Sequence, residues 1–315
     1  MTRKEAIVAR RSVRTYTGEP LKDKQLLDLR QFIATVKPLH PSIKMGLNIL
    51  SRQDFLRQFS AFGAHDSAHY LVIRSVRKEG YLENAGFIGQ QIALYLTEQG
   101  VGSCWLGNIR PREAEAPGQL PYVICMSFGR PDNSPIRHSP DEAKRKLVHE
   151  LVMGQISNPC LLDLLNAARL APSAINLQPV RYMTESTNIY AYRKLPLLNI
   201  EKLHLLQSID VGIALANIYV ASDFTRVFVR EKHFPTPVGN CIYEYTCLEP
   251  DAVQAREEAV YDQDDEADEV ELEYSEIENI YNSQNPGGED TDDGDGESFR
   301  VICDDPQDID EEERD

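Results

Sequence analysis

Apolar residues recur at helical spacing in several stretches of the chain. In one of them Leu26, Leu29 and Ile33 stand three or four positions apart, which is the pattern of a single helix face. Thr2 and Glu5 have the spacing of a capping box, which predicts a helix at the N-terminus. The same reasoning predicts further helices over residues 82–99, 159–170 and 209–223.

Strand patterns alternate with these helices. Ile43, Met45 and Leu47 are separated by single polar or small residues, which predicts a half-buried strand. Compact apolar runs over residues 103–106 and 122–128 are typical of central strands of a sheet. Further strands are predicted over residues 70–76, 181–183, 189–192 and 241–248.

The alternation of helices and strands stops after Pro250. Residues 251–315 hold 27 acidic and 3 basic side chains, a net charge of −24, so residues 1–250 carry +7 of the formal total of −17. A like-charged segment of this kind cannot bury enough apolar surface to offset its ordering entropy, so we predict a disordered acidic tail. The spacing of Tyr274, Ile277 and Tyr281 leaves open a short helix that docks on a partner protein.

Charge and hydropathy argue against several classes of protein. A body of charge +7 suits an anionic small-molecule ligand, but it lacks a dense Lys/Arg stripe with interleaved aromatic residues, so no nucleic-acid partner is expected. No uninterrupted apolar run approaches the roughly 20 residues of a membrane helix, so no membrane partner is expected. The N-terminus lacks the apolar core of a secretion signal, and the six cysteines show no C-x-x-C pair. We therefore expect a cytoplasmic protein with free thiols.

A faint internal repeat links the two long predicted helices. Asn84-Ala-Gly86-Phe87 aligns with Asp210-Val-Gly212-Ile213 at an offset of 126 residues. Each helix has a glycine in its first turns, where a backbone or a cofactor can approach closely. The match is too short to establish a repeat by itself, and it becomes informative only in combination with the motifs described next.

Three segments carry residue types that suit a cofactor. Residues 10–14, RRSVR, offer guanidinium groups and a hydroxyl to a phosphate, although an Arg-rich helix end also complements the helix dipole. Residues 171–179, APSAINLQP, place Ser, Asn and Gln on a proline-bounded loop that suits the edge of a heterocycle, or they form an ordinary polar turn. The glycines of residues 100–107, GVGSCWLG, allow the main chain to lie against a planar ligand. The same segment also has the pattern of a helix end followed by a buried strand.

Together, in this order, the three segments resemble the nitroreductase-like flavoprotein superfamily. RRSVRTY resembles its N-terminal phosphate-binding signature, and APSAINLQP resembles its flavin-contacting loop, usually written A-P-S-S-x-N-x-Q-P-W. The stretch from NAGFIGQQ to GSCWLG, followed by PYVICMSFGRP, resembles the helix and strands whose backbone faces the flavin. The flavin loop stands in the second half of the chain, and its usual place holds VKPLHPSIKMG. The chain thus resembles the two-repeat branch called putative TM nitroreductase, in which one chain imitates the family dimer.

This resemblance implies an α+β, nitroreductase-like fold with a pseudo-dimer inside one chain. Two half-repeats, residues 1–150 and 151–250, would form it around mixed sheets, with the disordered tail over 251–315. The implied activity is FMN-dependent oxidoreduction, in which electrons pass from the co-substrate NAD(P)H to a nitro compound, quinone or similar small-molecule acceptor. The implied assembly is a monomer with one composite site. The alternative is an inactive scaffold whose acidic tail recruits a basic protein partner.

The resemblance also assigns the residues of the FMN site. No catalytic residue is assigned, because the flavin carries the chemistry. Ala174 and Val180 stand where the family has a serine and a tryptophan, so the packing of the ring differs from the usual one. The assigned residues are Arg10, Ser12 and Arg14 at the phosphate and ribityl chain, Lys144 and Arg145 as a further phosphate-binding pair, Pro172, Ser173, Asn176 and Gln178 at the isoalloxazine, and the backbone of Trp105, Leu106 and Gly107 near the ring's reactive nitrogen.

Two weaker features remain. His65 and His69 have the i,i+4 spacing of metal ligands on a helix, but no glutamate follows the first histidine and no third ligand is evident, so no metal is expected. Cys104 stands in an apolar, strand-like run without a nearby base, so a buried thiol is expected rather than a nucleophile.

Overall fold

The computed structural model describes residues 1–60, 64–114, 116–133, 136–196, 200–250 and 301–302. The predicted disorder of the tail and its docking helix fall on residues outside these ranges, so both stay predictions. Within the tail, Val301 and Ile302 form a short strand, β9 (Val301–Ile302), that pairs in parallel with Met45 and Gly46. This pair is a local exception to the predicted disorder, and it occurs at one of the few β-branched runs of the acidic segment.

Local sequence signals explain where the N-terminal helices begin. In α1 (Arg3–Ala9) the Thr2 hydroxyl accepts a hydrogen bond from the Glu5 amide, and the Glu5 carboxylate accepts one from the Thr2 amide, so the predicted capping box is confirmed. The amphipathic helix α2 (Asp23–Ile33) is also present. A short helix, α3 (Arg52–Gln58), was not predicted, although the hydroxyl of Ser51 caps it by accepting from the Asp54 amide.

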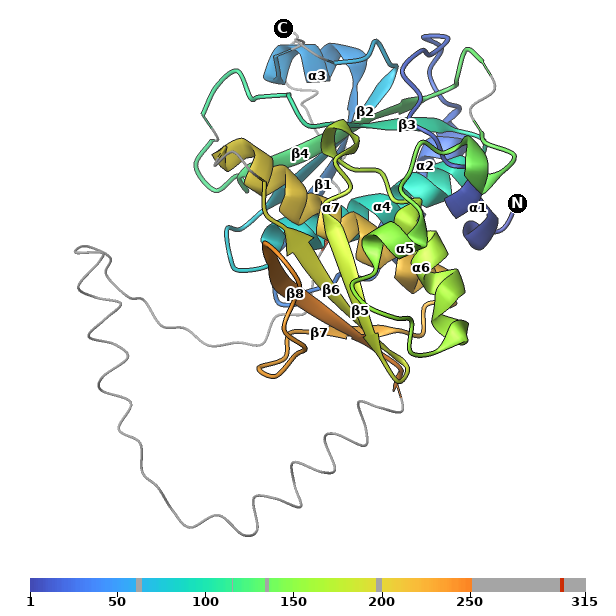
Figure 1. Ribbon diagram of the computed structural model, residues 1–315. Helices are drawn as coiled ribbons and strands as arrows, with labels where there is room; N and C mark the ends of the chain where they lie inside the picture. Colours follow the sequence, from blue (N-terminus) through green and yellow to red (C-terminus); the bar gives the residue numbers. More distant parts are fainter. Residues whose placement is uncertain (61–63, 115, 134–135, 197–199, 251–300, 303–315) are drawn as a thin grey trace, which may run out of the picture. The chain divides into compact units, whose positions relative to one another are not determined.

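The first sheet is built from residues 45–129 (Figure 1), and β9 adds to it at one edge. Its strand order is β3-β4-β2-β1-β9, and its pairs are antiparallel apart from β1 with β9. The prediction that residues 103–106 form a central strand is wrong, because β3 is an edge strand. It is nevertheless buried, since Ser103 forms a bridge with Ser12 and α4 packs on the strand. The strands are β1 (Met45–Ser51), β2 (His69–Ser75), β3 (Gly102–Leu106) and β4 (Tyr122–Gly129).

The second sheet is antiparallel and is built from residues 180–248. Its strand order is β5-β6-β8-β7, with β6 and β8 in the interior. Three of its strands match predicted ones, and the three-residue β7 was not predicted. The strands are β5 (Val180–Glu185), β6 (Asn188–Lys194), β7 (Val227–Val229) and β8 (Cys241–Leu248).

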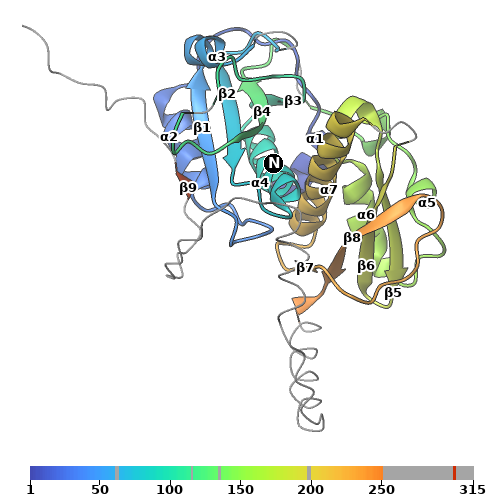
Figure 2. The same ribbon diagram turned by 90° about the vertical axis from the view of Figure 1, so that its left-hand side faces the viewer.

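Two long helices, α4 (Tyr81–Glu98) and α7 (Glu201–Ala221), pack together between the sheets (Figure 2). Both are apolar on nearly all sides, which is typical of a buried helix rather than a surface helix. α7 begins eight residues before its predicted start. The prediction missed its first two turns, EKLHLLQS, because they are more polar than the rest of the helix. The smaller helices are α5 (Val148–Leu151), α6 (Leu162–Arg169) and the 3₁₀ turns η1 (Pro140–Glu142), η2 (Pro159–Leu161) and η3 (Ala174–Asn176).

Helix α7 is long and apolar enough, by length and composition alone, to cross a membrane. The core helix of a soluble protein meets the same criterion. In this chain 72% of the apolar window is buried inside the protein.

The two long helices cross at a pair of glycines in a reciprocal way. A Cβ at Gly86 would lie 2.1 Å from the Ile209 carbonyl oxygen, and a Cβ at Gly212 would lie 1.9 Å from the Glu83 carbonyl oxygen. Gly212 and Ile209 follow Gly86 and Glu83 by the repeat offset, so each helix presents the same glycine to the same position of the other. This exchange of partners is the signature of a two-fold interface. The structure thus confirms an α+β fold and gives the sequence repeat a spatial counterpart.

Candidate active site

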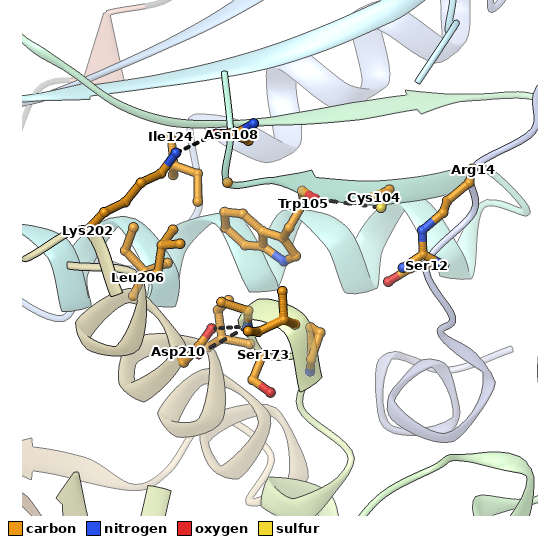
Figure 3. A pocket seen from close by; sticks show the side chains of 16 residues that line it. Ser12, Arg14, Cys104, Trp105, Asn108, Ile124, Ser173, Lys202, Leu206 and Asp210 are labelled. Atoms are coloured by element: carbon orange, nitrogen blue, oxygen red, sulfur yellow. Dashed lines mark hydrogen bonds between the residues drawn. The ribbon is translucent and has the colours of Figure 1, made fainter. Parts of the chain in front are cut away.

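A pocket of about 400 Å³ lies between α7, β3 and the loop before β5. Figure 3 shows Ser12 and Arg14 at one end, Lys202 and Leu206 at the other, and the Trp105 indole between them, facing Ser173 and Asp210. Helix α7 contributes one face to it, because its lining residues follow each other at helical spacing. They are Lys202, Leu206, Ile209, Asp210 and Ile213.

Trp105 is positioned by the packing of β3 on α4. A Cβ at Gly89 would lie 2.3 Å from Cη2 of the indole, so the ring occupies the space that a side chain at this glycine would fill. The indole Nε1 donates to Gln90 Oε1 at 3.5 Å, and Gln90 Nε2 donates to Asn217 Oδ1 of α7 at 2.9 Å. The ring therefore packs in the core along one edge and lines the pocket along the other.

The loop that closes the pocket has an unusual backbone. Ile175, Asn176 and Gln178 have φ values of 43°, 59° and 50°, in the left-handed region that β-branched residues rarely adopt. Ile175 lines the pocket and is nevertheless 85% exposed. Strain and exposed apolar surface concentrated in one loop are typical of a functional site.

Hydrogen bonds from three directions hold this loop. Both carboxylate oxygens of Asp210 accept from the Ala174 amide, at 3.0 and 3.1 Å, and the Ser173 hydroxyl accepts from the Gln178 amide at 2.9 Å. Arg145 donates to Asn176 Oδ1 at 2.5 Å, and it also donates to the Ala171 carbonyl at 3.0 Å.

Two of the predicted flavin contacts have another role in this structure. The Asn176 Nδ2 donates to the Lys144 carbonyl at 3.0 Å, and the Gln178 Oε1 accepts from the Lys146 amide at 2.7 Å. Their side chains therefore join the loop to the segment that links the two sheets, and neither lines the pocket.

Behind the end of the pocket that holds Ser12 and Arg14 lies a cluster of guanidinium groups. Arg10 is 2% exposed, and its Nη1 has no hydrogen-bond partner among the residues that the structure describes. Burial, together with the positive charges of Arg137 and Arg145, lowers the pKa of Arg10 to about 9. The pKa of Arg137 is lowered to about 10 by burial and by Arg145, with Glu142 as the opposing negative charge. The repulsion among the positive charges of Arg10, Arg137 and Arg145 favours the binding of an anion beside them.

Arg137 is a buried residue beside Arg10 that the sequence did not single out. It donates from Nε to the Val8 carbonyl at 3.0 Å and from Nη2 to the Arg10 carbonyl, so it fixes the backbone that carries the RRSVR motif. It stands in the segment SPIRHS, which resembles no phosphate-binding motif.

Asp210 was also missed as a site residue. It is 4% exposed, and burial raises its pKa to about 8, although the Ala174 amide and Arg145 both act to lower it. The available signal was a single acidic residue within an otherwise apolar helix, SIDVGIALANIYVA. A buried carboxyl group without a close ion pair is costly, so its presence in a pocket points to function.

The structure brings together part of the predicted site. Arg10 and Arg145 lie behind the pocket, Lys144 is exposed, and Leu106 lies on the other face of β3, in a cluster with Phe55 and Tyr70. The burial of Cys104 raises its pKa, in accord with the expected inert thiol. Those predicted residues that line the pocket are Ser12, Arg14, Trp105, Gly107, Pro172 and Ser173.

The opposite end of the helix pair is built differently. There, a cavity of about 600 Å³ beside the first turn of α4 has four basic and four acidic lining residues. Arg193 and Glu244 form an ion pair of 2.7 Å in it, and His40 packs against Gly80 and bonds to Tyr245 at 2.6 Å. His40 belongs to the segment VKPLHPSIKMG, which takes the place of the flavin loop. The charges at this end are balanced within the protein, unlike those around Arg10.

The two histidines of the HDSAH segment do not form a metal site in this structure. His69 Nε2 accepts from the Leu21 amide at 3.0 Å. Among the residues that the structure describes, no group of three metal-ligating side chains comes together.

Comparisons with known proteins complete the picture of this site. The family model described as Putative TM nitroreductase matches residues 2–222. Among solved structures, a putative nitroreductase from Thermotoga maritima MSB8 superposes with a TM-score of 0.53 at 21% identity, over 79% of this chain and 94% of that chain. This likeness confirms the predicted nitroreductase-like fold.

Two further structures come from Clostridium difficile. A nitroreductase family protein from strain 630 has 16% identity and a TM-score of 0.41, over 49% of this chain and 99% of that chain. An FMN-dependent nitroreductase from strain R20291 has 15% identity and a TM-score of 0.36, over 44% of this chain and 93% of that chain. No curated protein matches the chain.

Proposed function

The chain belongs to the Putative TM nitroreductase family, and from this premise we propose that it is an FMN-dependent NAD(P)H oxidoreductase. The proposed acceptor is a nitro compound, a quinone or a similar small molecule. We further propose that it acts as a cytoplasmic monomer without a nucleic-acid or membrane partner. A basic protein that binds the acidic tail is a separate proposal, and it bears on no part of the site.

The observation that carries this proposal is the unpartnered Nη1 of Arg10. A buried guanidinium nitrogen that finds no acceptor among the described parts of the chain leaves a hydrogen-bond donor unsatisfied. Arg14 and Ser12 open onto the same end of the pocket, and Arg137 and Arg145 add positive charge. A phosphate with three acceptor oxygens would satisfy this donor set.

The rest of the pocket fits a planar heterocycle. Its volume of about 400 Å³ lies within the range of small-molecule sites. Trp105 and Leu206 supply flat and apolar surface, and Gly107 leaves its backbone accessible. Residues of both halves line the pocket, which supports one composite site in a single chain.

Different residues of the site bind different parts of the cofactor. We propose that Arg10, Ser12, Arg14 and Arg145 hold the phosphate, and that residues 172–175 and the backbone of residues 105–107 enclose the ring. When bound, the flavin accepts a hydride from NAD(P)H and passes its electron pair to the acceptor. Lys202 donates to Asn108 Oδ1 at 2.6 Å and so joins the two halves at the other end of the pocket.

The test is the spectrum and turnover of the purified full chain after incubation with FMN. We expect a yellow protein after removal of free FMN, with the visible absorption of bound flavin, and oxidation of NADH or NADPH that depends on menadione or nitrofurazone. A colourless protein that supports no NAD(P)H oxidation would contradict the proposal and favour the scaffold alternative.

A further inference from the structure

Within the proposed function, we propose that Asp210 is the proton donor for acceptors reduced in this pocket. The inference rests on the proposed oxidoreductase activity and adds a proton-transfer role to a residue of α7. Figure 3 shows the Asp210 side chain at the pocket, beside Ser173 and on the side opposite Trp105.

The chain itself contains a matched comparison for this residue. Asn84 occupies the equivalent position of α4, at the repeat offset, and its Oδ1 accepts from the Leu39 and His40 amides at 2.8 and 3.1 Å. Asp210 holds the loop before β5 through the Ala174 amide in the same way. A neutral amide therefore suffices to hold such a loop, so loop positioning does not explain a carboxyl group at residue 210.

What the carboxyl adds is a proton that can be released. Burial raises the pKa of Asp210 to about 8, so the group is largely protonated near neutral pH. A buried acid with a pKa near the working pH suits general acid catalysis. Asn84, at the end of the helix pair with balanced charges, cannot play this role.

The groups that face Asp210 come from several elements. Arg145, between η1 and α5, lowers its pKa, while Arg14, Cys104 and Lys202 line the same pocket. Helix α4 meets this turn of α7 through Gly86, and its Glu83 carbonyl faces Gly212. Arg169 of α6 and Tyr182 of β5 line a second, smaller cavity that Asp210 also borders.

That second cavity offers space for the water that reprotonates Asp210. It measures about 20 Å³, enough for one water molecule, and Ser173 and Gln178 line it as well. Asp210 thus borders both the main pocket and a mainly apolar cavity of the size of one water molecule, in which Arg169, Ser173 and Gln178 supply polar groups. A carboxylate in this position can take a proton from that side after it has released one into the pocket.

The proposed step balances for a quinone. The acceptor gains an electron pair and one hydrogen from the reduced cofactor, and one of its oxygens is left with a negative charge. That oxygen forms an O–H bond with the proton of Asp210 while the carboxyl O–H bond breaks. The carboxylate is then reprotonated by water.

The experiment compares a quinone with an acceptor that needs no proton. The FMN-loaded full chain and its Asp210→Asn variant are assayed with menadione and with ferricyanide, which takes single electrons without a proton. Asn should still accept from the Ala174 amide, so the FMN dissociation constant should change by less than about threefold. The ratio of menadione to ferricyanide turnover should fall about 100-fold or more at pH 7.

Two further measurements make the result independent of this variant's folding. In the wild-type chain the same ratio should fall as the pH rises through about 8, because Asp210 then loses its proton. The infrared spectrum of the apoprotein at pH 6 should show the carbonyl stretch of a protonated carboxylic acid that is lost at pH 10 and absent from Asp210→Asn. As a control, the Asn84→Asp exchange at the other end of the helix pair should leave the ratio unchanged.

The outcomes are distinct. A ratio in Asp210→Asn within threefold of wild type, or a wild-type ratio that is flat between pH 6 and 10, would overturn the role of Asp210. A wild-type chain that binds no FMN and reduces neither acceptor would overturn the proposed function, and this inference with it.

Discussion

The Gly212→Ala variant should lose about 1–3 kcal/mol of its free energy of unfolding, because the added methyl group collides with backbone on the facing helix. A Cβ at this position would lie 1.9 Å from the Glu83 carbonyl oxygen and 2.9 Å from the Phe87 amide nitrogen. Neither atom can move without shifting α4. In an unhindered helix the same change would stabilise the protein by about 1 kcal/mol, so the sign of the effect is itself diagnostic.

Urea denaturation followed by circular dichroism measures this effect. Gly46→Ala in β1 is the control, because its Cβ would meet only ordinary contacts, the nearest at 3.5 Å from Leu120 Cδ1. We expect the control to unfold within about 1 kcal/mol of wild type. A Gly212→Ala variant as stable as this control would show that the two helices do not cross as described.

The Arg14→Ala variant should bind FMN about 10- to 150-fold more weakly than the wild-type chain. The expected loss is that of one charge-assisted hydrogen bond to the phosphate, about 1.5–3 kcal/mol. Arg14 lines the pocket, and its side chain projects into the end that also holds Ser12 (Figure 3). The loss should shrink at high salt, because exposed charges are screened.

Quenching of FMN fluorescence on titration with apoprotein measures the dissociation constant. The matched control is Arg57→Ala, which removes an exposed arginine that pairs with Asp54 on α3. This control should bind FMN as the wild-type chain does. Equal affinity in a folded Arg14→Ala variant would remove Arg14 from the phosphate site.

Local signals in the sequence were sufficient for much of the fold. The Thr2 capping box, the periodicity of α4 and the alternation in β1 depend on neighbouring residues, so they were predictable without knowledge of tertiary structure. The position of β3 at a sheet edge was not, because its burial comes from α4 and from the bridge between Ser12 and Ser103. The early start of α7 was also hidden, since a polar first turn carries a weak periodic signal.

In the candidate site, too, some residues were predictable from local sequence motifs and others only from the tertiary structure. Arg14, Trp105 and Ser173 stand in recognisable motifs, and they line one pocket although more than 150 residues separate the first from the last. Arg137 belongs to no motif, and Asp210 stands only in the faint internal repeat. Both were singled out by burial and by charge, which only the folded chain displays. Asn176 stands in a motif, but its side chain bonds to Arg145 and to the Lys144 carbonyl and does not line the pocket. A motif position therefore does not determine which partner a side chain selects in a strained loop.

We propose that one chain forms one flavin site from residues of both of its halves. Native mass spectrometry of the full chain with excess FMN tests this most directly, because it counts cofactors and chains in the same particle. We expect a monomer that carries a single FMN and that takes up no second one at higher FMN concentration. Two FMN molecules per monomer, or FMN bound only to a dimer, would contradict it.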